Sequence, residues 1–487
     1  MNTTINTTSL NTTSANTTSA NTANMAFENA RLLAKNIYVD NNTHNTQLNN
    51  NDLIIGPAGA GKTRGYVMPN ILSGNESLIV TDTKNSLRRF LQPYLKQQGI
   101  AVYNIDFSGI SHSTVGYNPF DNIDIDINGN YSERDVLCMA EQLAPIHNTK
   151  DIFWDISAKY VIASMIAYVM ECFHKDQRNI AALAKLAGHF DEYEYMLSEL
   201  SIENENSLAI KYYNVLKATG SAEKMRSSII SVIFEKLTPL DNSAANNLYN
   251  APERISFEKL SSEKSVLFLN VSDSDRSSDV LVSLFYAQAL HSLMTIADMN
   301  EENHLQIPVR LILDDFAAGT TIADFDKIIS VIRSRDIYVS IILQSLSQLE
   351  ALYSAPCAKT IINNCDHWLY LGGQDIDTIE QISLKSNKMP VSIANLPLDK
   401  VLLFERGKSA QIADKFDISL SPVYDELTAL NEEHRKQKQM REAAEAAAIK
   451  SAKPDDKPCY DNDNEKDNAE FDEFPFPYDE FDDFPFA

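Results

Sequence analysis

Cysteine is scarce in this chain, and no spacing among its cysteines suits a metal or disulfide framework. There are five in 487 residues: Cys138, Cys172, Cys357, Cys365 and Cys459. None of them forms a C-x-x-C pair, and their number is odd. Both observations favour reduced thiols over a disulfide-stapled or zinc-binding domain.

Long apolar runs are also lacking. The two most apolar stretches, 156–170 and 280–296, are interrupted by Lys, His, Gln or Ser, and we expect them to fall short of a membrane span. The first residues are polar and have no hydrophobic region of the kind found in a signal peptide. The sequence therefore predicts a cytoplasmic protein.

Positive charge is in deficit. The chain has 42 Lys and Arg against 67 Asp and Glu, and residues 454–487 alone hold thirteen acidic residues and two Lys. The net charge is −25. Nonspecific coating of nucleic acid depends on Lys and Arg contacts to phosphates, so this class of function is disfavoured. A basic lining of a DNA channel is still compatible with this net charge, because local positive patches steer a polyanion more than the net charge does.

Both ends of the chain have compositions that bury no core. Residues 1–24 nearly repeat Asn-Thr-Thr and Ser-Ala, which predicts a disordered leader over 1–45, with Met1 or Met25 as the start. Residues 454–487 alternate acidic residues with Phe and contain Pro, which predicts a disordered tail. The tail is either a solubilising segment or a short linear motif whose aromatic side chains dock on a partner.

The most informative run is a strand-like segment, 53–55, followed by a glycine-rich loop. The loop residues are Gly56, Pro57, Ala58, Gly59, Ala60, Gly61, Lys62 and Thr63. The spacing G-x-x-x-x-G-K-T is typical of a P-loop that binds a nucleoside triphosphate. Its glycines let backbone N–H groups turn toward phosphates, Lys62 adds positive charge, and the Thr63 hydroxyl can bind Mg²⁺. A helix expected after the loop would point its N-terminal dipole at the same anion.

Two acids follow a second apolar strand, expected over 309–313. A P-loop enzyme needs a carboxylate for Mg²⁺ and a group that orients the attacking water. We assign Mg²⁺ binding, directly or through a water molecule, to Asp314. We assign the orientation of the attacking water to Asp315. A strand that ends in an acidic turn is common, so this assignment depends on the upstream P-loop.

A polar residue and two arginines flank the next expected strand, 338–343. Gln344 ends this strand, where it could sense the γ-phosphate. Arg333 and Arg335 end a helix expected over 322–335. Either could reach across a subunit boundary as an arginine finger, and the ordinary alternative for each is a surface arginine or a local ion pair.

Strands and helices alternate in a pattern typical of a parallel α/β sheet. The helical period alone continues through the middle of the chain, which predicts an all-α domain inserted into the α/β fold. Strands are expected over 53–55, 78–81, 101–105, 266–271, 309–313, 339–343 and 368–371. The predicted division is a leader (1–45), a first motor part (46–130), an inserted all-α domain (131–255), a second motor part (256–425), an exposed charged helix (426–453) and the acidic tail (454–487).

Several blocks of residues resemble, in order, the TraG-type coupling proteins of type IV secretion and conjugation. The resemblance covers roughly residues 45–425. The blocks are Gly56–Thr63, Met68-Pro69-Asn70, Val80-Thr81-Asp82-Thr83-Lys84, Tyr117-Asn118-Pro119, Leu313-Asp314-Asp315-Phe316-Ala317, Ile342-Leu343-Gln344-Ser345, Gln348-Leu349 and Ile362-Asn363-Asn364-Cys365.

This resemblance implies a RecA-like, HerA/FtsK-type motor that uses ATP and Mg²⁺ as a ring homo-hexamer. It implies coupling of ATP hydrolysis to the movement of DNA and an attached relaxase toward a type IV secretion channel. The inserted all-α domain would contact the secreted substrate or its accessory protein. The resemblance also favours Arg333 over Arg335 as the finger and supports Gln344 as the sensor.

The chain departs from the family pattern at three places. Asp315 stands where members usually have Glu, so we expect looser positioning of the water. The block after Asp82 is altered. We also expect the usual N-terminal membrane segment to be missing, with the low-complexity leader in its place. A separate membrane-anchoring protein would then bring the chain to the membrane. Two alternatives remain: a nucleotide-binding adaptor without motor activity, and a HerA- or FtsK-like DNA pump, which shares the motor but not the Tyr-Asn-Pro and Asn-Asn-Cys blocks.

Overall fold

The computed structural model describes residues 30–108, 113–145, 152–218, 223–272, 274–316, 319 and 321–451. Residues up to Glu432 form one compact unit, and the rest of the chain forms a second. Most of the predicted leader and the whole predicted tail (454–487) lie outside the described residues. The description below concerns the first unit unless stated otherwise.

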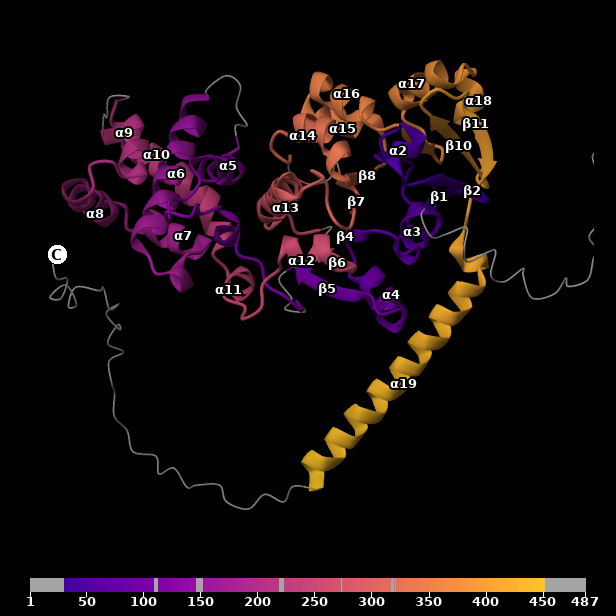
Figure 1. Ribbon diagram of the computed structural model, residues 1–487, viewed down its shortest axis with the longest axis horizontal. Helices are drawn as coiled ribbons and strands as arrows, with labels where there is room; N and C mark the ends of the chain where they lie inside the picture. Colours follow the sequence, from indigo (N-terminus) through magenta and orange to yellow (C-terminus); the bar gives the residue numbers. More distant parts are fainter. Residues whose placement is uncertain are drawn as a thin grey trace, which may run out of the picture. The chain divides into compact units, whose positions relative to one another are not determined.

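A nine-stranded sheet forms the centre of this unit (Figure 1). Its strand order is β11-β10-β9-β3-β8-β7-β4-β6-β5. The seven strands from β9 to β5 are parallel, and β10 and β11 extend the sheet antiparallel to their neighbours. The strands are β3 (Asp52–Ile55), β4 (Ser77–Asp82), β5 (Ala101–Asp106), β6 (Ser265–Asn270), β7 (Val309–Leu313), β8 (Ile337–Leu343), β9 (His367–Tyr370), β10 (Lys400–Glu405) and β11 (Gln411–Asp414).

The central strands are buried on both faces, which explains their continuous apolar sequences. Side chains alternate between two cores: in β3, Leu53 and Ile55 belong to one and Ile54 to the other. The predicted α/β class with a mostly parallel sheet is confirmed. Helices cover both faces (Figure 1): α3 (Met68–Leu72), α4 (Ser86–Gln97), α12 (Phe257–Ser262), α13 (Asp279–Met299), α14 (Phe325–Val331), α15 (Leu346–Tyr353), α16 (Ala355–Asn363), α17 (Ile376–Ser386) and α18 (Pro390–Ala394).

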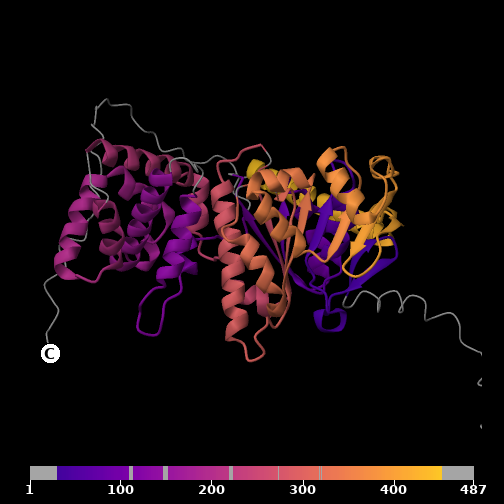
Figure 2. The same cartoon turned by 90° about the horizontal axis from the view of Figure 1, so that it is seen from above.

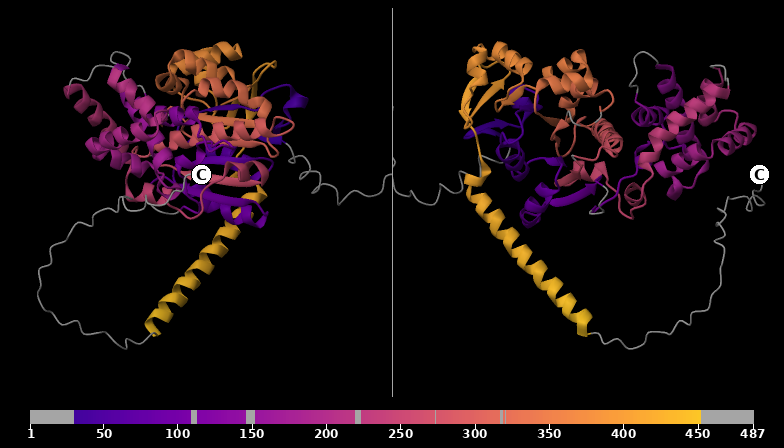
Figure 3. Two further views of the ribbon diagram at one scale, coloured as in Figure 1. Left: turned by 60° about the vertical axis from the view of Figure 1, so that its left-hand side comes forward. Right: turned by 180° about the vertical axis from the view of Figure 1, so that it is seen from behind.

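Between β5 and β6 the described chain is helical, as the period predicts. These helices gather beside the sheet-bearing part, next to α13 (Figures 2 and 3). They are α5 (Glu133–Leu143), α6 (Ile152–Cys172), α7 (Ile180–Gly188), α8 (Phe190–Glu203), α9 (Leu208–Ala218), α10 (Glu223–Leu237) and α11 (Ser243–Tyr249). The division of the chain into a motor and an inserted domain remains a prediction, because both parts lie in one compact unit.

Two helices are longer and more apolar than the stretches 156–170 and 280–296 predicted from the sequence. Both α6 and α13 have 21 residues and pass a membrane-span test by length and composition, with mean hydropathies of 1.3 and 1.5. The expectation that these stretches fall short on those criteria is therefore wrong. Within their most apolar windows, 61% of α6 and 56% of α13 is buried inside the protein. Core helices pass the same test, so the finding is weak evidence for a membrane span.

The predicted leader is wrong over residues 30–45. This segment forms a two-stranded antiparallel ribbon, β1 (Ala30–Ala34) and β2 (Ile37–Asp40), and the start of the short helix α2 (Thr43–Thr46). The side chain of Asn70 fixes β1 by accepting from Leu32 N at 2.8 Å and donating to Leu32 O at 2.9 Å. The ribbon is thereby attached to the helix that follows the glycine-rich loop.

A buried ionic cluster explains why this segment is ordered. Arg31 donates through Nε and Nη2 to both carboxylate oxygens of Asp52, at 2.8 and 2.9 Å. Arg310 Nη1 lies 3.4 Å from the same carboxylate and its Nε lies 2.6 Å from Glu76. Burial, reinforced by the Arg31 charge, lowers the pKa of His367 to about 3, so this ring is neutral beside Arg31. The cluster lies at the amino ends of β3, β7 and β9.

The predicted exposed helix begins earlier than expected. Helix α19 runs over Pro422–Ser451 rather than from 426. One face of its first turns is packed against the protein, because Leu427 is fully buried and Asn431 Nδ2 donates to Phe90 O at 2.8 Å. The side chains from Glu433 to Met440 are exposed, as predicted.

Candidate functional site

The residues expected to act on a nucleotide meet at the carboxyl edge of the sheet. In the register, Ile55 pairs with Leu343 and Leu313 pairs with Ile341. The glycine-rich loop after β3, Gln344 after β8 and the acids after β7 therefore leave neighbouring strands at the same edge. This edge is where open α/β sheets place their ligands.

The loop has the backbone geometry that a phosphate cradle needs. Gly59 and Gly61 have φ values of +76° and +90°, which residues with a Cβ rarely adopt. Little space is left at Gly56, since a Cβ there would lie 3.0 Å from Leu371 Cβ and would force that side chain to shift. Pro57, Ala58 and Gly59 are exposed. The exposed loop and its positive φ values fit a phosphate chain held by backbone N–H groups.

A helical turn follows the loop directly. Thr63–Val67 is a single π-helical turn, and α3 continues from it. Such turns are frequent at functional sites. Thr63 stands at its start with a half-buried side chain, where its hydroxyl can reach a cation held by the phosphates.

Lys62 lies inside its own loop. Its Nζ donates to Gly56 O at 2.6 Å and to Pro57 O at 3.3 Å. Burial lowers the pKa of this ammonium, and the charges of Asp315 and Asp314 oppose the shift. The ammonium is held at the loop by carbonyl oxygens that a phosphate can replace as partners.

The two acids after β7 lie close to this ammonium. Asp315 N donates to Asp314 Oδ1 at 3.0 Å, and Asp315 adopts a left-handed φ of 50°. Burial and the neighbouring Asp315 charge raise the pKa of Asp314 to about 6. A partly desolvated carboxylate beside another acid is stabilised by a cation, so the pair fits Mg²⁺.

Gln344 lies at the predicted place. Its Nε2 donates to Asp315 Oδ1 at 3.4 Å, and its side chain is exposed at the edge of the sheet. The structure therefore brings together Lys62, Asp314, Asp315 and Gln344, four residues that the sequence places in three separate segments.

The two candidate arginines lie far from this edge. Arg333 and Arg335 belong to a 3-10 turn, Ile332–Arg335, just before β8, whereas Gln344 follows that strand. Seven strand residues separate the two ends by about 20 Å at the usual rise. Neither arginine can serve the site of its own chain in this arrangement.

The two arginines differ in their partners. Arg335 makes a bidentate ion pair with Asp298 through Nε and Nη2, at 2.7 and 2.9 Å. Among the described residues, no hydrogen bond or ion pair engages the side chain of Arg333, which is half-buried. Of the two arginines, Arg335 is thus engaged within the chain, whereas the described residues leave the Arg333 guanidinium unengaged.

Sequence reasoning missed a second lysine at the loop. Lys415, directly after β11, donates from Nζ to Ala60 O at 3.2 Å and to Leu371 O at 3.4 Å. Phe416 O lies so close to Gly65 that a Cβ there would meet it at 2.8 Å. Lys415 is 355 residues after Ala60 and belongs to no motif, so the sequence carries no signal for this contact.

Asp82, in one of the resemblance blocks, has mainly a structural role in the described residues. It ends β4 beside β7, and its carboxylate accepts from Ser86 N at 3.1 Å and Arg88 N at 3.0 Å. These bonds fix the start of α4. The Asp82 charge also contributes to the raised pKa of Asp314. A separate cavity is lined by residues of β5 and α11, such as Asp106 and Leu248, and by none of the glycine-rich loop.

Comparison with known proteins gives one family. A family model described as type IV secretory system conjugative DNA transfer matches residues 11–394. The VirD4 protein of Rhizobium radiobacter is 22% identical over 371 residues, which are 76% of this chain and 52% of VirD4. VirD4 of Agrobacterium fabrum is 22% identical over 332 residues, 68% of this chain and 48% of its own. The chain thus spans about half the length of the curated relatives it matches.

Solved structures show the same fold. The conjugative coupling protein TrwB, in a trigonal form with sulphate, matches with a TM-score of 0.59 and 16% identity over 75% of this chain and 85% of its own. TrwB in complex with ADP and Mg²⁺ matches with a TM-score of 0.57, 16% identity and the same coverage. VirB4 of Thermoanaerobacter pseudethanolicus has a TM-score of 0.51 and 14% identity, over 81% of this chain and 98% of its own.

Proposed function

Because the chain belongs to the type IV secretory system conjugative DNA transfer family, we propose that it is an ATP-hydrolysing coupling protein. One observation carries the proposal: a basic P-loop residue, two acids and a glutamine from three strands meet at one edge of the sheet. The TrwB structures with ADPNP and with ADP and Mg²⁺ support ATP and Mg²⁺ as the ligands.

Each residue of the site has a role in hydrolysis. The loop N–H groups and Lys62 bind the phosphates, with the Lys62 ammonium exchanging its loop carbonyls for phosphate oxygens. Thr63 and Asp314 hold Mg²⁺, which when bound supplies charge neutralisation for the phosphates. Asp315 orients the attacking water, and Gln344 positions the Asp315 carboxylate through the contact at 3.4 Å.

Arg333 completes the site of a neighbouring copy. Its distance from its own loop supports a role in trans, in which its guanidinium stabilises charge on the transferred phosphoryl group. The absence of a hydrogen bond or ion pair on its side chain among the described residues supports the same role. A homo-hexameric ring, expected from the family resemblance, would repeat this contact at each subunit boundary.

The wider activity follows from the family. The proposed substrates are DNA, single- or double-stranded, and an attached relaxase, delivered to a type IV secretion channel. The helical segment 131–255 contacts the substrate, and a separate membrane-anchoring protein recruits this cytoplasmic chain to the inner face of the membrane. The acidic tail, 454–487, serves partner binding and is dispensable for hydrolysis.

A rate measurement tests the proposal. ATP turnover of the purified chain, with and without single- and double-stranded DNA, is compared for wild type, Lys62→Ala and Arg333→Ala. We expect stimulation by DNA and loss of turnover in both variants. Arg335→Ala is the matched control, since Arg335 lies on the same turn but is paired with Asp298, and it should retain turnover.

Mixing distinguishes action in trans from action in cis. Subunits with Lys62→Ala are combined with subunits with Arg333→Ala, so that some boundaries unite an intact lysine with an intact arginine. Partial recovery of turnover supports the shared site. Turnover that is absent in wild type, while ATP binds tightly, would favour the nucleotide-binding adaptor instead.

A further inference from the structure

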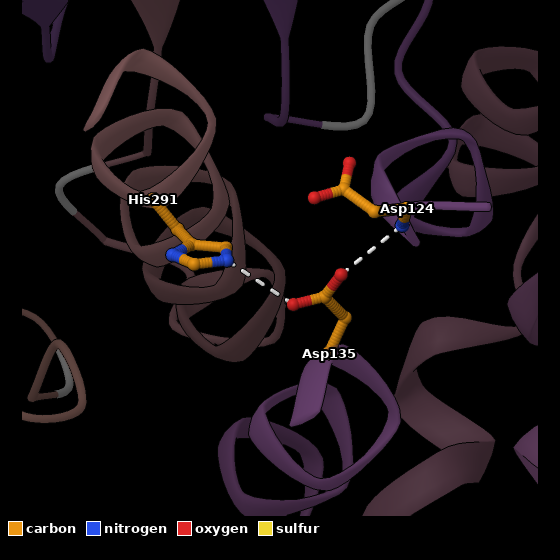
Figure 4. Close-up of side chains that lie close together, drawn as sticks. All are labelled: Asp124, Asp135 and His291. Atoms are coloured by element: carbon orange, nitrogen blue, oxygen red, sulfur yellow. Dashed lines mark hydrogen bonds and ion pairs between the residues drawn. The ribbon is translucent and has the colours of Figure 1, made fainter. Parts of the chain in front are cut away.

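A second group of metal-ligating side chains lies away from the nucleotide site, where the helical segment meets the motor. Asp124 follows the 3-10 turn Pro119–Asn122, Asp135 lies in the first turn of α5, and His291 lies on α13. Figure 4 shows the three side chains converging from these elements. One ligand atom from each residue lies within 4.8 Å of the other two.

The central carboxylate of this group is buried and only half satisfied. Asp135 is 5% exposed. Its Oδ2 accepts from Asp124 N at 3.0 Å, which fixes the carboxylate relative to the loop. Among the described residues, no well-directed hydrogen bond reaches its Oδ1, which makes only an ion-pair contact with His291 Nε2 at 3.1 Å. That contact has the distance of an ion pair without the direction of a hydrogen bond. A buried carboxylate oxygen without a donor is costly unless a cation serves it.

The spacing fits two ligands of one metal ion. Bonds of about 2.0 to 2.2 Å from a divalent ion to nitrogen and oxygen, at angles between octahedral and tetrahedral, separate adjacent ligand atoms by about 2.8 to 3.6 Å. The observed 3.1 Å between Asp135 Oδ1 and His291 Nε2 lies within this interval. Asp124, which is exposed at the rim, can supply the third ligand, and water can fill the remaining positions.

One charge acts against a cation at this place. Arg134 Nη2 lies 3.4 Å from His291 Nδ1 on the far side of the ring. Within the described residues, the charged or titratable groups that interact in this cluster are Asp124, Asp135, His291, Arg134 and the thiol of Cys138, which lies one helical turn after Asp135. Two carboxylates outweigh one guanidinium, and the arginine is attached to a flexible side chain.

We propose that Asp124, Asp135 and His291 bind one divalent transition-metal ion, such as Zn²⁺, which joins α5 to α13. The imidazole nitrogen favours such an ion over Mg²⁺ or Ca²⁺, which prefer oxygen ligands alone. The ion connects the helical segment to the motor helix that packs against it. This site is independent of the nucleotide site and of the proposed ATP hydrolysis.

Calorimetric titration tests the proposal. Metal-stripped, reduced full-length protein is titrated with zinc chloride in the absence of nucleotide, and Co²⁺ absorption bands serve as a second readout. We expect the wild-type protein to bind one additional zinc ion that neither His291→Gln nor Asp135→Asn binds. If the variants still bind this ion, we expect their affinity for it to be at least tenfold lower. Asp124→Asn, at the exposed rim, should weaken binding without disturbing the fold, which circular dichroism verifies.

Two further variants separate this site from adventitious binding. His304→Gln is the matched control, because His304 also contacts two acids, Glu302 and Asp336, but through opposite ring nitrogens that cannot bind one ion together. It should leave the isotherm unchanged. Arg134→Gln removes the opposing charge and should tighten zinc binding. An isotherm that is the same in wild type and His291→Gln, as cysteine binding alone would give, overturns the proposal.

Discussion

Replacing Arg31 by alanine should destabilise the motor, although this residue lies in the segment whose composition predicts disorder. The side chain is 2% exposed and makes a bidentate ion pair with Asp52, whose side chain is equally buried. Its Nη1 also donates to Asn41 and Asn50, at 2.9 and 3.0 Å. The substitution therefore leaves a buried carboxylate and two amide oxygens without their main donor.

The expected loss follows from what remains around Asp52. Removing one partner of a buried ion pair usually costs about 3–5 kcal/mol. Arg310 and Tyr66 still contact this carboxylate, so we expect the lower half of that range, about 3–4 kcal/mol. An ion pair of the same bidentate geometry lies at the surface between Arg335 and Asp298. Because both partners there are partly exposed, Arg335→Ala should cost no more than about 1 kcal/mol.

The stability difference between wild type and Arg31→Ala changes with pH in one direction. Burial raises the pKa of Asp52, but the charges of Arg31 and Arg310 outweigh burial and hold the pKa below its usual value. The stabilisation by this ion pair is complete above the unfolded pKa, near 4, and disappears as pH falls through the lower folded pKa. The difference between wild type and Arg31→Ala should therefore shrink only in strong acid.

Urea denaturation followed by the fluorescence of Trp368 measures the effect. This tryptophan follows His367 in β9, next to the ionic cluster, and the chain has only one other. The comparison of Arg31→Ala with Arg335→Ala isolates burial, since the pairing geometry is the same. Equal free energies of unfolding for the two variants would refute the assignment of residues 30–45 to the folded motor.

Asp314→Asn should stabilise the nucleotide-free protein by about 1–3 kcal/mol at pH 8, because the folded pKa of Asp314, about 6, is above the unfolded value. The gain should vanish near pH 4 in denaturation curves, and a gain that persists there would contradict it. Asp315→Glu should raise steady-state ATP turnover several-fold, because its carboxylate extends one methylene closer to the water, and a lower rate would count against the assigned role. Gly65→Ala should weaken nucleotide binding and lower the free energy of unfolding by about 1–3 kcal/mol, because the added Cβ displaces Phe416. Nucleotide titration and thermal melting measure the two effects. Gly188→Ala is the control, because a Cβ there meets open space.

The parallel core and the nucleotide edge were predictable because both depend on local sequence. Strands buried on both faces are continuous apolar runs, and β7 was predicted over the residues it occupies. The carboxyl ends of parallel strands share one edge, so Gly56, Asp314 and Gln344 could be brought together without a structure. The register then separates Arg333 from them by the length of a strand.

The ribbon β1–β2 and its ionic cluster could not be predicted from composition. The segment that follows it is rich in Asn, yet Asn41 and Asn50 are buried because Arg31 binds their side chains. A prediction from composition assumes that polar residues are exposed. Only the tertiary fold shows that these polar groups are buried and form hydrogen bonds with each other. The contact of Lys415 with Ala60 has the same origin, since it joins opposite ends of the motor sequence.

Strand β8 is a rigid element that has a residue of the proposed mechanism at each of its ends. Its seven residues are all buried and are hydrogen-bonded to β3 on one side and β7 on the other. At one end, Gln344 donates to Asp315, and Arg333 lies just before the other end. In a ring of the proposed kind, this one strand would join the nucleotide site of its own subunit to the arginine at the boundary with the next, without any flexible relay between them.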